Sequence, residues 1–213
     1  SRRHLRAELR RLQRTARPLE APLLTMVDQE GGQVKRLSGP PSVSPARMGA
    51  RGTAYTGAQG RATAANLRAV ALNVNLAPVA DLGLPGSYQR ATGRAFGDRA
   101  APVSAAVRAF ATGLQAGGVA ATLKHFPGLG RVSGDEDARV QTVRASADTL
   151  RHQDEAPFRA GIRGGVRLVM TSTARYPALD RGPALLSPAI TTSELRGRLG
   201  FRGVVITDDL DVP

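Results

Sequence analysis

The sequence feature that most constrains the fold is a short apolar run that leads directly into two carboxylates. Residues 203–210 read Gly-Val-Val-Ile-Thr-Asp-Asp-Leu. A short run of Val and Ile that is bounded by Gly is typical of a strand buried on both faces. Two adjacent carboxylates repel each other and are not needed for packing. Their place at the end of this strand therefore predicts a chemical role for Asp208, with Asp209 beside it.

Four further apolar runs end in polar residues in the same way. They are residues 23–27 before Asp28, 74–80 before Asp81, 120–123 before Lys124 and His125, and 166–170 before Thr171. Strands that each deliver polar groups at their C-terminal ends are the arrangement of an α/β barrel active site. We therefore expect an enzyme site where five parallel strands end, with Asp208 at its centre.

Helical patterns alternate with these strands, which predicts βα repeats and a parallel sheet. The predicted helices span residues 2–15, 58–72, 100–116 and 147–163, and long loops are predicted at 38–57 and 83–97. The expected fold class is α/β, a (β/α)8 TIM-type barrel that is incomplete, because about five βα units are visible and a closed barrel takes about 250 residues. An open doubly wound sheet is the alternative. The absence of a G-x-G-x-x-G sequence argues against a dinucleotide site.

Composition narrows the range of partners. The 213 residues correspond to one domain, with no apolar run long enough to span a membrane. The net charge of +13 comes almost wholly from Arg. Such a charge suggests nucleic acid, but no nucleic-acid motif or aromatic platform accompanies it, so we expect no nucleic-acid partner. Guanidinium groups on solvated helix faces account for the charge, and an anionic cell-wall polymer would suit it too. Cytoplasmic and secreted or cell-surface bacterial locations both stay open, as does the oligomeric state.

Five motifs, taken together and in order, resemble one known family. They are Asp-Gln-Glu-Gly-Gly-Gln-Val-Lys-Arg at 28–36, Asn-Leu-Ala-Pro-Val-Ala-Asp at 75–81, Gly-Arg-Ala-Phe-Gly at 93–97, Lys-His-Phe-Pro-Gly at 124–128 and the run at 203–210. The chain resembles the N-terminal barrel of family 3 glycoside hydrolases, and most closely the β-N-acetylhexosaminidase branch. The resemblance implies that residues 1–213 are one catalytic barrel domain in part, with further barrel strands outside it. We expect this segment alone to be poorly soluble and inactive.

The resemblance also implies roles for individual residues. Asp208 would be the nucleophile that forms a covalent glycosyl intermediate. Residues at five other motif positions would contact the sugar, and they are Asp28, Arg36, Arg94, Lys124 and His125. No cofactor is implied. We also expect no metal, because the only other histidines, His4 and His152, are not at ligand spacing.

Three departures from the family pattern leave the acid/base unassigned. The branch usually reads Lys-His-Phe-Pro-Gly-His-Gly and then Asp-Ser-His, whose His is the acid/base. Leu129 replaces the first of these His residues, and Asp135, Glu136 and Asp137 stand where Asp-Ser-His would be. Asp137 is therefore the candidate acid/base, with Asp135 in support, since burial or a nearby carboxylate can raise the pKa of a carboxylic acid. Thr173 occupies another position where the family often has His.

The expected function is that of a retaining exo-acting hydrolase that removes β-linked N-acetylglucosamine from cell-wall, peptidoglycan-derived sugars. Its partner is a carbohydrate substrate. Two alternatives stay open at this point. The first is a β-glucosidase, β-xylosidase or glycoside phosphorylase of the same family, and the second is a sugar-binding protein that has lost its acid/base.

Overall fold

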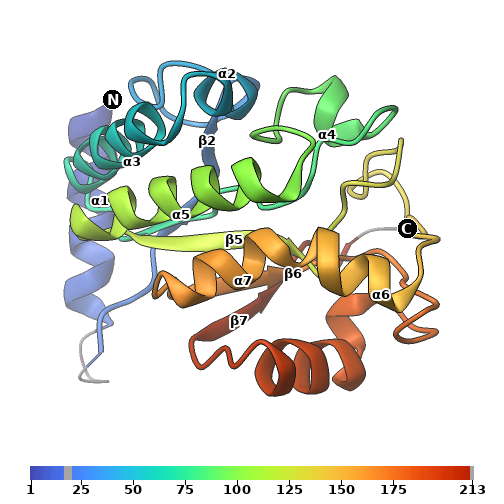
Figure 1. Ribbon diagram of the computed structural model, residues 1–213. Coiled ribbons are helices and arrows are strands. Elements are labelled where there is room, and N and C mark those ends of the chain that lie inside the picture. The colour runs from blue at the N-terminus through green and yellow to red at the C-terminus, as the bar shows by residue number, and fades with distance from the viewer. Residues whose placement is uncertain (17–20, 212–213) are drawn as a thin grey trace.

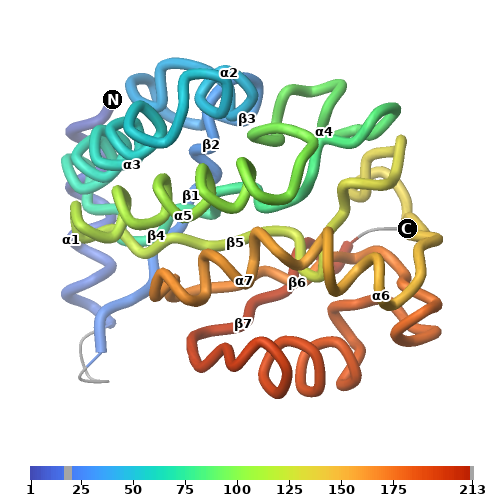
Figure 2. Tube along the Cα trace, viewed as in Figure 1, coloured from blue at the N-terminus to red at the C-terminus, as the bar shows by residue number. Residues whose placement is uncertain are grey.

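The computed structural model describes residues 1–16 and 21–211. Its main sheet has five strands in the order β1-β4-β5-β6-β7, and all neighbouring pairs are parallel. The strands are β1 (Met26–Val27), β4 (Val74–Asn75), β5 (Ala120–Phe126), β6 (Leu168–Thr171) and β7 (Val204–Thr207). A separate antiparallel hairpin pairs β2 (Gln29–Gly31) with β3 (Val34–Lys35), and Figure 2 shows it beside α2.

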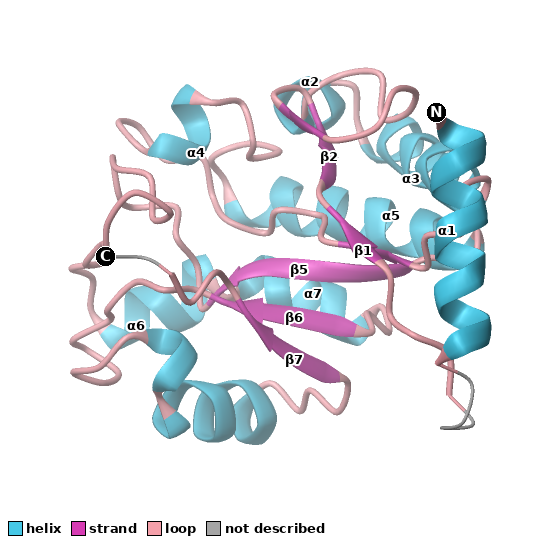
Figure 3. Cartoon of the chain, turned by 180° about the vertical axis from the view of Figure 1, so that it is seen from behind, coloured by secondary structure: helices cyan, strands magenta, loops and turns pink. Residues whose placement is uncertain are grey.

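Helices connect the strands, and some of them cover one face of the sheet. They are α1 (Arg2–Thr15), α2 (Pro45–Ala50), α3 (Thr53–Arg68), α4 (Tyr88–Ala91), α5 (Ala100–Ala116), α6 (Ala147–Thr149), η2 (Leu150–Asp154), α7 (Ala156–Arg163), η3 (Ala184–Leu186) and η4 (Ala189–Arg198). In Figure 1, α3, α5 and α7 lie in front of the sheet, whereas Figure 3 shows β5, β6 and β7 uncovered from behind. Parallel strands with helices on one face and an open face opposite are an incomplete α/β barrel. The predicted fold class is confirmed.

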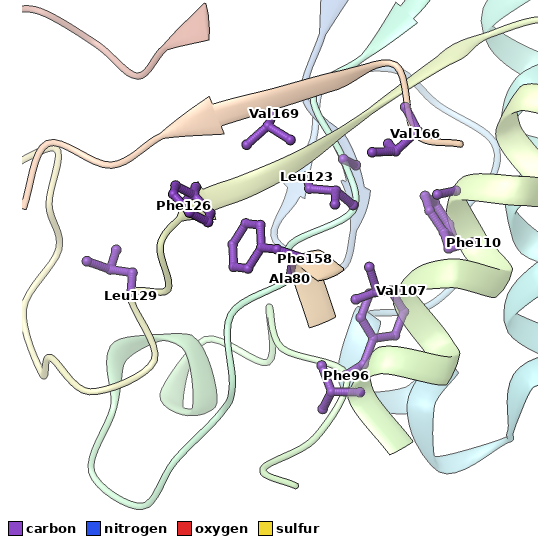
Figure 4. Close-up of a cluster of buried hydrophobic side chains, with 14 of the residues drawn as sticks. Ala80, Phe96, Val107, Phe110, Leu123, Phe126, Leu129, Phe158, Val166 and Val169 are labelled. Carbon is purple, nitrogen blue, oxygen red and sulfur yellow. The ribbon is translucent and has the colours of Figure 1, made fainter. Parts of the chain in front are cut away.

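The core lies between the sheet and this helical layer. Phe110 of α5, Leu123 and Phe126 of β5, and Phe158 of α7 are buried there together (Figure 4). The rings of Phe126 and Phe158 meet edge to face with centroids 5.3 Å apart, a favourable aromatic geometry. This packing fixes the start of the loop that follows β5, because Phe126 is the last residue of that strand.

Glycines allow α3 and α5 to pack with their backbones in contact. A Cβ at Gly60 would lie 2.4 Å from the carbonyl oxygen of Phe110, and a Cβ at Gly113 would lie 2.4 Å from that of Gly57. Real Cβ atoms do not come this close to backbone, so a side chain at either position would push the helices apart. Two of the helices that back the sheet are therefore held at one fixed spacing.

Two predicted strands are shorter than expected. The prediction of a strand at 23–27 is wrong for its first residues, because the backbone N–H and carbonyl of Leu23 bond to the Gln13 side chain of α1 and not to a strand. The strand predicted at 74–80 ends at Asn75. Pro78 has no N–H to donate, although the segment still bonds to β5 beyond it, from the N–H of Ala80 to the carbonyl of Lys124 at 2.7 Å.

Both predicted loops contain helices. The loop at 38–57 holds α2 and the start of α3, and the loop at 83–97 holds α4. Ser44 and Ser87 cap the two short helices, since each hydroxyl accepts a bond from the N–H three residues on. The helix predicted at 147–163 is also broken, into α6, η2 and α7. Pro157 lies at the start of α7 and cannot donate a bond back into the preceding turn.

Candidate active site

The strand ends surround a cavity of about 400 Å³. All eight residues that the sequence singled out line it, and they are Asp28, Arg36, Arg94, Lys124, His125, Asp135, Asp137 and Asp208. They come from the segments that follow β1, β4, β5 and β7, and from β5 itself. Figure 3 shows β5, β6 and β7 pointing toward the side of the molecule where α4 lies, which is the side of this cavity.

Charge sets this cavity apart from the surrounding surface. Six of the 17 acidic residues line it, although the chain as a whole carries a net charge of +13. A larger and more open groove runs over α3 and α5, but small, mostly apolar residues and two arginines line it, with no carboxylate. The cavity at the strand ends is therefore the one equipped for acid–base chemistry.

Asp28, Arg94 and Lys124 line the cavity on the side of β1, and the carboxylate of Glu30 is buried against both cations. Lys124 Nζ lies 2.7 Å from both Asp28 Oδ1 and Glu30 Oε1. Arg94 donates to the two oxygens of Glu30 at 2.9 and 2.8 Å, a bidentate pair. Burial alone would raise the pKa of Glu30, but Lys124 and Arg94 outweigh burial and bring this pKa down to about 2. Glu30 is thus ionised at any working pH and fixes both cations.

His125 is held by a carboxylate behind it. Its Nδ1 lies 2.7 Å from Oδ2 of Asp81, while Oδ1 of Asp81 accepts the backbone N–H groups of His125 and Leu129. Burial by itself would lower the pKa of His125, but the negative charges of Asp81 and Glu136 raise it to about 9. The ring is therefore a cation at neutral pH, and its Nε2 lies 3.7 Å from Oδ2 of Asp208.

Asp208 projects from the end of β7 into the cavity. The Asp208 N–H donates to the Thr171 carbonyl at 3.1 Å, so β6 fixes its backbone. The Asp209 N–H donates to Oδ1 of Asp208 at 2.9 Å, which leaves Oδ2 directed at His125. Asp209 lines the cavity too, and its own Oδ1 accepts the Asp211 N–H, so it supports the turn. One oxygen of Asp208 is anchored and the other is available to a ligand.

The loop over the cavity carries the remaining carboxylates. Tyr88 of α4 donates its hydroxyl to Oδ2 of Asp135 at 2.8 Å. Asp137 is exposed at the rim, where partial burial and the carboxylates of Asp208 and Asp135 raise its pKa. Glu136 points inward and is only 3% exposed. Its Oε2 accepts three bonds from Ser172 and Thr173 at 2.7–3.0 Å.

Sequence reasoning missed three buried acids of this site. Glu30 and Asp81 lie inside quoted motifs, and Glu136 lies between two candidate residues, but none of the three was given a role. Glu30 follows Asp28 by two residues, so it could have been placed on the same face of a strand. No signal in the sequence links Asp81 to His125 or Glu136 to Thr173, because those contacts join different strand ends.

One group of side chains has the composition of a metal site. Donor atoms of His125, Glu136 and Asp208 lie within 4.8 Å of one another. Imidazole nitrogen and carboxylate oxygen are ligands that zinc accepts, and a carboxylate behind the ring, as Asp81 is here, is common at such sites. The sequence-based expectation of no metal rested on histidine spacing alone, and it stays a prediction.

The described part of the chain contains no helix with the length and apolar character that a membrane crossing requires.

Comparison with known proteins agrees with this geometry. The chain matches the Glycosyl hydrolase family 3 N terminal domain over residues 2–213. A beta-hexosaminidase of Stenotrophomonas maltophilia (strain R551-3) is 41% identical over 201 residues, which cover 89% of this chain and 58% of that protein.

Solved structures of similar proteins superpose closely on this chain. The β-N-acetylhexosaminidase of Beutenbergia cavernae has a TM-score of 0.88 at 36% identity, and the match covers 97% of this chain and 65% of that one. NagZ of Neisseria gonorrhoeae has a TM-score of 0.90 at 31% identity, over 99% of this chain and 64% of that one. The chain thus spans less than two thirds of the length of these three relatives. The resemblance carried by its five motifs is confirmed, and the chain belongs to glycosyl hydrolase family 3.

Proposed function

We propose that this protein is a retaining exo-β-N-acetylglucosaminidase, and that a covalent glycosyl intermediate forms on Asp208. The observation that carries the proposal is the setting of Asp208. One of its oxygens is anchored by a backbone N–H and the other faces the cavity, opposite further acidic groups. Retaining glycosidases need one carboxylate to attack the anomeric carbon and an acid to protonate the leaving oxygen. The relatives named hexosaminidases support the choice of sugar.

The wall built from Asp28, Lys124 and Arg94 suits a sugar ring. Carboxylate oxygens accept bonds from hydroxyl groups, and ammonium and guanidinium groups donate to them. Arg36 lies at the same cavity and adds another donor. Because Glu30 holds both Lys124 and Arg94 in place, their donors are ordered before a ligand arrives. This order reduces the side-chain conformational entropy that is lost when the ligand binds.

The proposed reaction has two steps. Asp208 attacks the anomeric carbon while Asp137 gives its proton to the departing glycosidic oxygen, and Asp135 supports Asp137. Asp137, now ionised, then takes a proton from water, which attacks the same carbon and releases Asp208. The raised pKa of Asp137 favours the protonated form that the first step needs. His125 lies beside Asp208 as a cation and offsets the charge of the carboxylate.

The rates at which the protein hydrolyses a set of aryl glycosides test this function. The full-length protein should release nitrophenol from the β-N-acetylglucosaminide faster than from the β-glucoside or β-xyloside, with the sugar product first appearing as the β-anomer. Added phosphate should not change the product, whereas a phosphorylase would form a sugar phosphate. Turnover of the glucoside or xyloside alone would point to the sister activities. Sugar binding without turnover of any aryl glycoside would favour a binding protein.

Cell-wall fragments are the substrate class that we propose within this function. The net charge of +13 suits an anionic polymer environment, and N-acetylglucosamine is β-linked in peptidoglycan. Release of N-acetylglucosamine from soluble peptidoglycan fragments, compared with release from chitin disaccharide, is the measurement that separates this substrate from other N-acetylglucosaminides.

We also propose that residues 1–213 are part of one longer catalytic barrel domain. The two outer strands of the sheet support this, because Met26 of β1 is 37% exposed and Val204 of β7 is 47% exposed. Exposed apolar edge strands favour association with other chains. We therefore expect residues 1–213 to be poorly soluble and inactive, and a version extended beyond Pro213 to be soluble and active. A soluble, cooperatively melting and active 1–213 protein would contradict this.

A further inference from the structure

Glu136 is a buried acidic side chain that lines the cavity and that the proposed mechanism does not use. Its carboxyl group reaches away from its own loop to the end of β6, where Oε2 accepts from the hydroxyl of Ser172 and from both the hydroxyl and the N–H of Thr173. Its Oε1 is buried and has no hydrogen-bond partner among the described residues. Oε1 makes one longer contact with a charged group, because Nδ1 of His125 lies 3.6 Å away from it.

This arrangement is costly for stability. A buried carboxylate oxygen without a partner loses its hydration and gains no bond in return. Burial raises the pKa of Glu136, as does the nearby Asp208 carboxylate, whereas His125 and the Ser172 bond lower it. A small neutral side chain would avoid this cost. The gain must therefore come from what the three bonds fix, since they join the loop after β5 to the end of β6.

The same three bonds anchor the residue that directly precedes Asp137. The two residues before Asp137 are each tied to another part of the chain, Asp135 to Tyr88 of α4 and Glu136 to Thr173 beyond β6. Asp137 itself has an exposed side chain, and its N–H donates to Oδ1 of Asp135 at 3.3 Å. With both neighbours anchored, little freedom is left to the backbone that carries its carboxyl group.

We propose that Glu136 is a positioning residue that fastens the 131–142 loop to the end of β6 and so holds the Asp137 carboxyl at the cavity. The proposal rests on the proposed function, in which Asp137 is the acid. A general acid must be held within hydrogen-bond reach of the atom that it protonates, and small displacements from that position are costly to the rate. Glu136 supplies that constraint through Ser172 and Thr173 and touches no reacting atom.

The experiment compares two substrates that differ only in the need for acid assistance. In Glu136→Ala, kcat/KM should fall about 10- to 100-fold for a phenyl glycoside and less than about threefold for a dinitrophenyl glycoside, whose leaving group needs no proton. Glu136→Gln keeps an oxygen for the same three donors and should lose less than Glu136→Ala. Arg139→Ala, an exposed change in the same loop, should leave both rates unchanged.

A double-mutant cycle tests the stated contact. Thr173→Val removes one of the three donors, so its effect on kcat/KM should be smaller when Glu136 is already alanine than in the wild type. Additive effects would show that the Glu136–Thr173 bond does not act on the rate. Equal losses in Glu136→Gln and Glu136→Ala would mean that charge matters and not hydrogen bonding. Either result would overturn the proposal.

Azide separates positioning from direct proton transfer. An anion can replace a missing acid/base carboxylate by attacking the glycosyl intermediate, so azide should accelerate turnover of the dinitrophenyl glycoside by Asp137→Ala and yield a glycosyl azide. Azide should not do so for Glu136→Ala, in which Asp137 is still present. Rescue of Glu136→Ala instead would make Glu136 the acid/base and overturn the proposal. Failure of the proposed function is distinguishable, because the wild type would then not turn over either substrate.

Discussion

Replacing Asp208 with asparagine is expected to lower kcat/KM for the aryl β-N-acetylglucosaminide by at least about 1,000-fold, or about 4 kcal/mol of transition-state stabilisation. Asparagine keeps the size of the side chain and can still accept the Asp209 N–H. It cannot form the glycosyl ester or offset the positive charge that develops at the anomeric carbon. Steady-state kinetics of the purified full-length protein give the ratio directly.

The matched control for this substitution is Asp211→Asn. It makes the same chemical change three residues along, at an exposed side chain whose residue interacts through its backbone N–H. Its kcat/KM should equal that of the wild type. Mass spectrometry of protein quenched during turnover should also find one added sugar on the peptide that contains Asp208. Equal activity of Asp208→Asn and the wild type would remove Asp208 from the mechanism.

The Glu30→Gln substitution is expected to cause the largest loss of stability at the cavity. Glu30 is fully buried beside Lys124 and Arg94, and a neutral amide would leave Arg94 without its carboxylate partner and Lys124 with Asp28 alone. Removal of one partner from a buried ion pair typically costs about 3–5 kcal/mol. Urea unfolding at pH 7 should show a loss of this size, and sugar affinity should fall with it, because Lys124 and Arg94 lose their anchor.

The pH dependence of this loss provides a further check. Since the folded-state pKa of Glu30 is about 2, below its ordinary value of 4.5, its contribution is complete above pH 4.5 and is lost as the pH falls toward 2. The stability difference between wild type and Glu30→Gln should therefore shrink over that range. Glu8→Gln is the control, because Glu8 pairs with Arg11 on an exposed helix face and should change stability by about 0–1 kcal/mol. A Glu30→Gln protein as stable as Glu8→Gln would contradict the assigned network.

The order of the main elements could be predicted from the sequence, because apolar period and turn residues are local signals. The helix at Ala100–Ala116 is found at the predicted residues, since Val103, Val107 and Phe110 repeat at helical spacing. The residues at which the strands begin and end were less predictable. At Leu23 the backbone bonds to a side chain of α1. A sequence pattern does not show whether a backbone group will bond to a neighbouring strand or to such a side chain.

The members of the site could be predicted better than their partners. Asp28, Lys124, His125 and Asp208 come directly after apolar runs, and the parallel sheet brings those ends together. The other four candidates depended on the family motifs, and they are Arg36, Arg94, Asp135 and Asp137. Contacts such as Asp81 with His125 depend on which strand ends are neighbours and how far each loop reaches. The sequence also does not show that the side chain of Glu136 points inward. Asp135, Glu136 and Asp137 all carry a carboxyl group, and they differ only in the direction in which each side chain points.

The strand order has a consequence for the growing chain on the ribosome. Because β1, β4, β5, β6 and β7 are neighbours in the order of synthesis, each strand after the first pairs with one that has already emerged. The network of Glu30, Arg94 and Lys124 can form as soon as β5 leaves the exit tunnel. Asp208 arrives later, with β7. The charges of Glu30, Arg94 and Lys124 can thus be paired before β6 and β7 are made, and the carboxylate that completes the cavity is among the last of the described residues to be made.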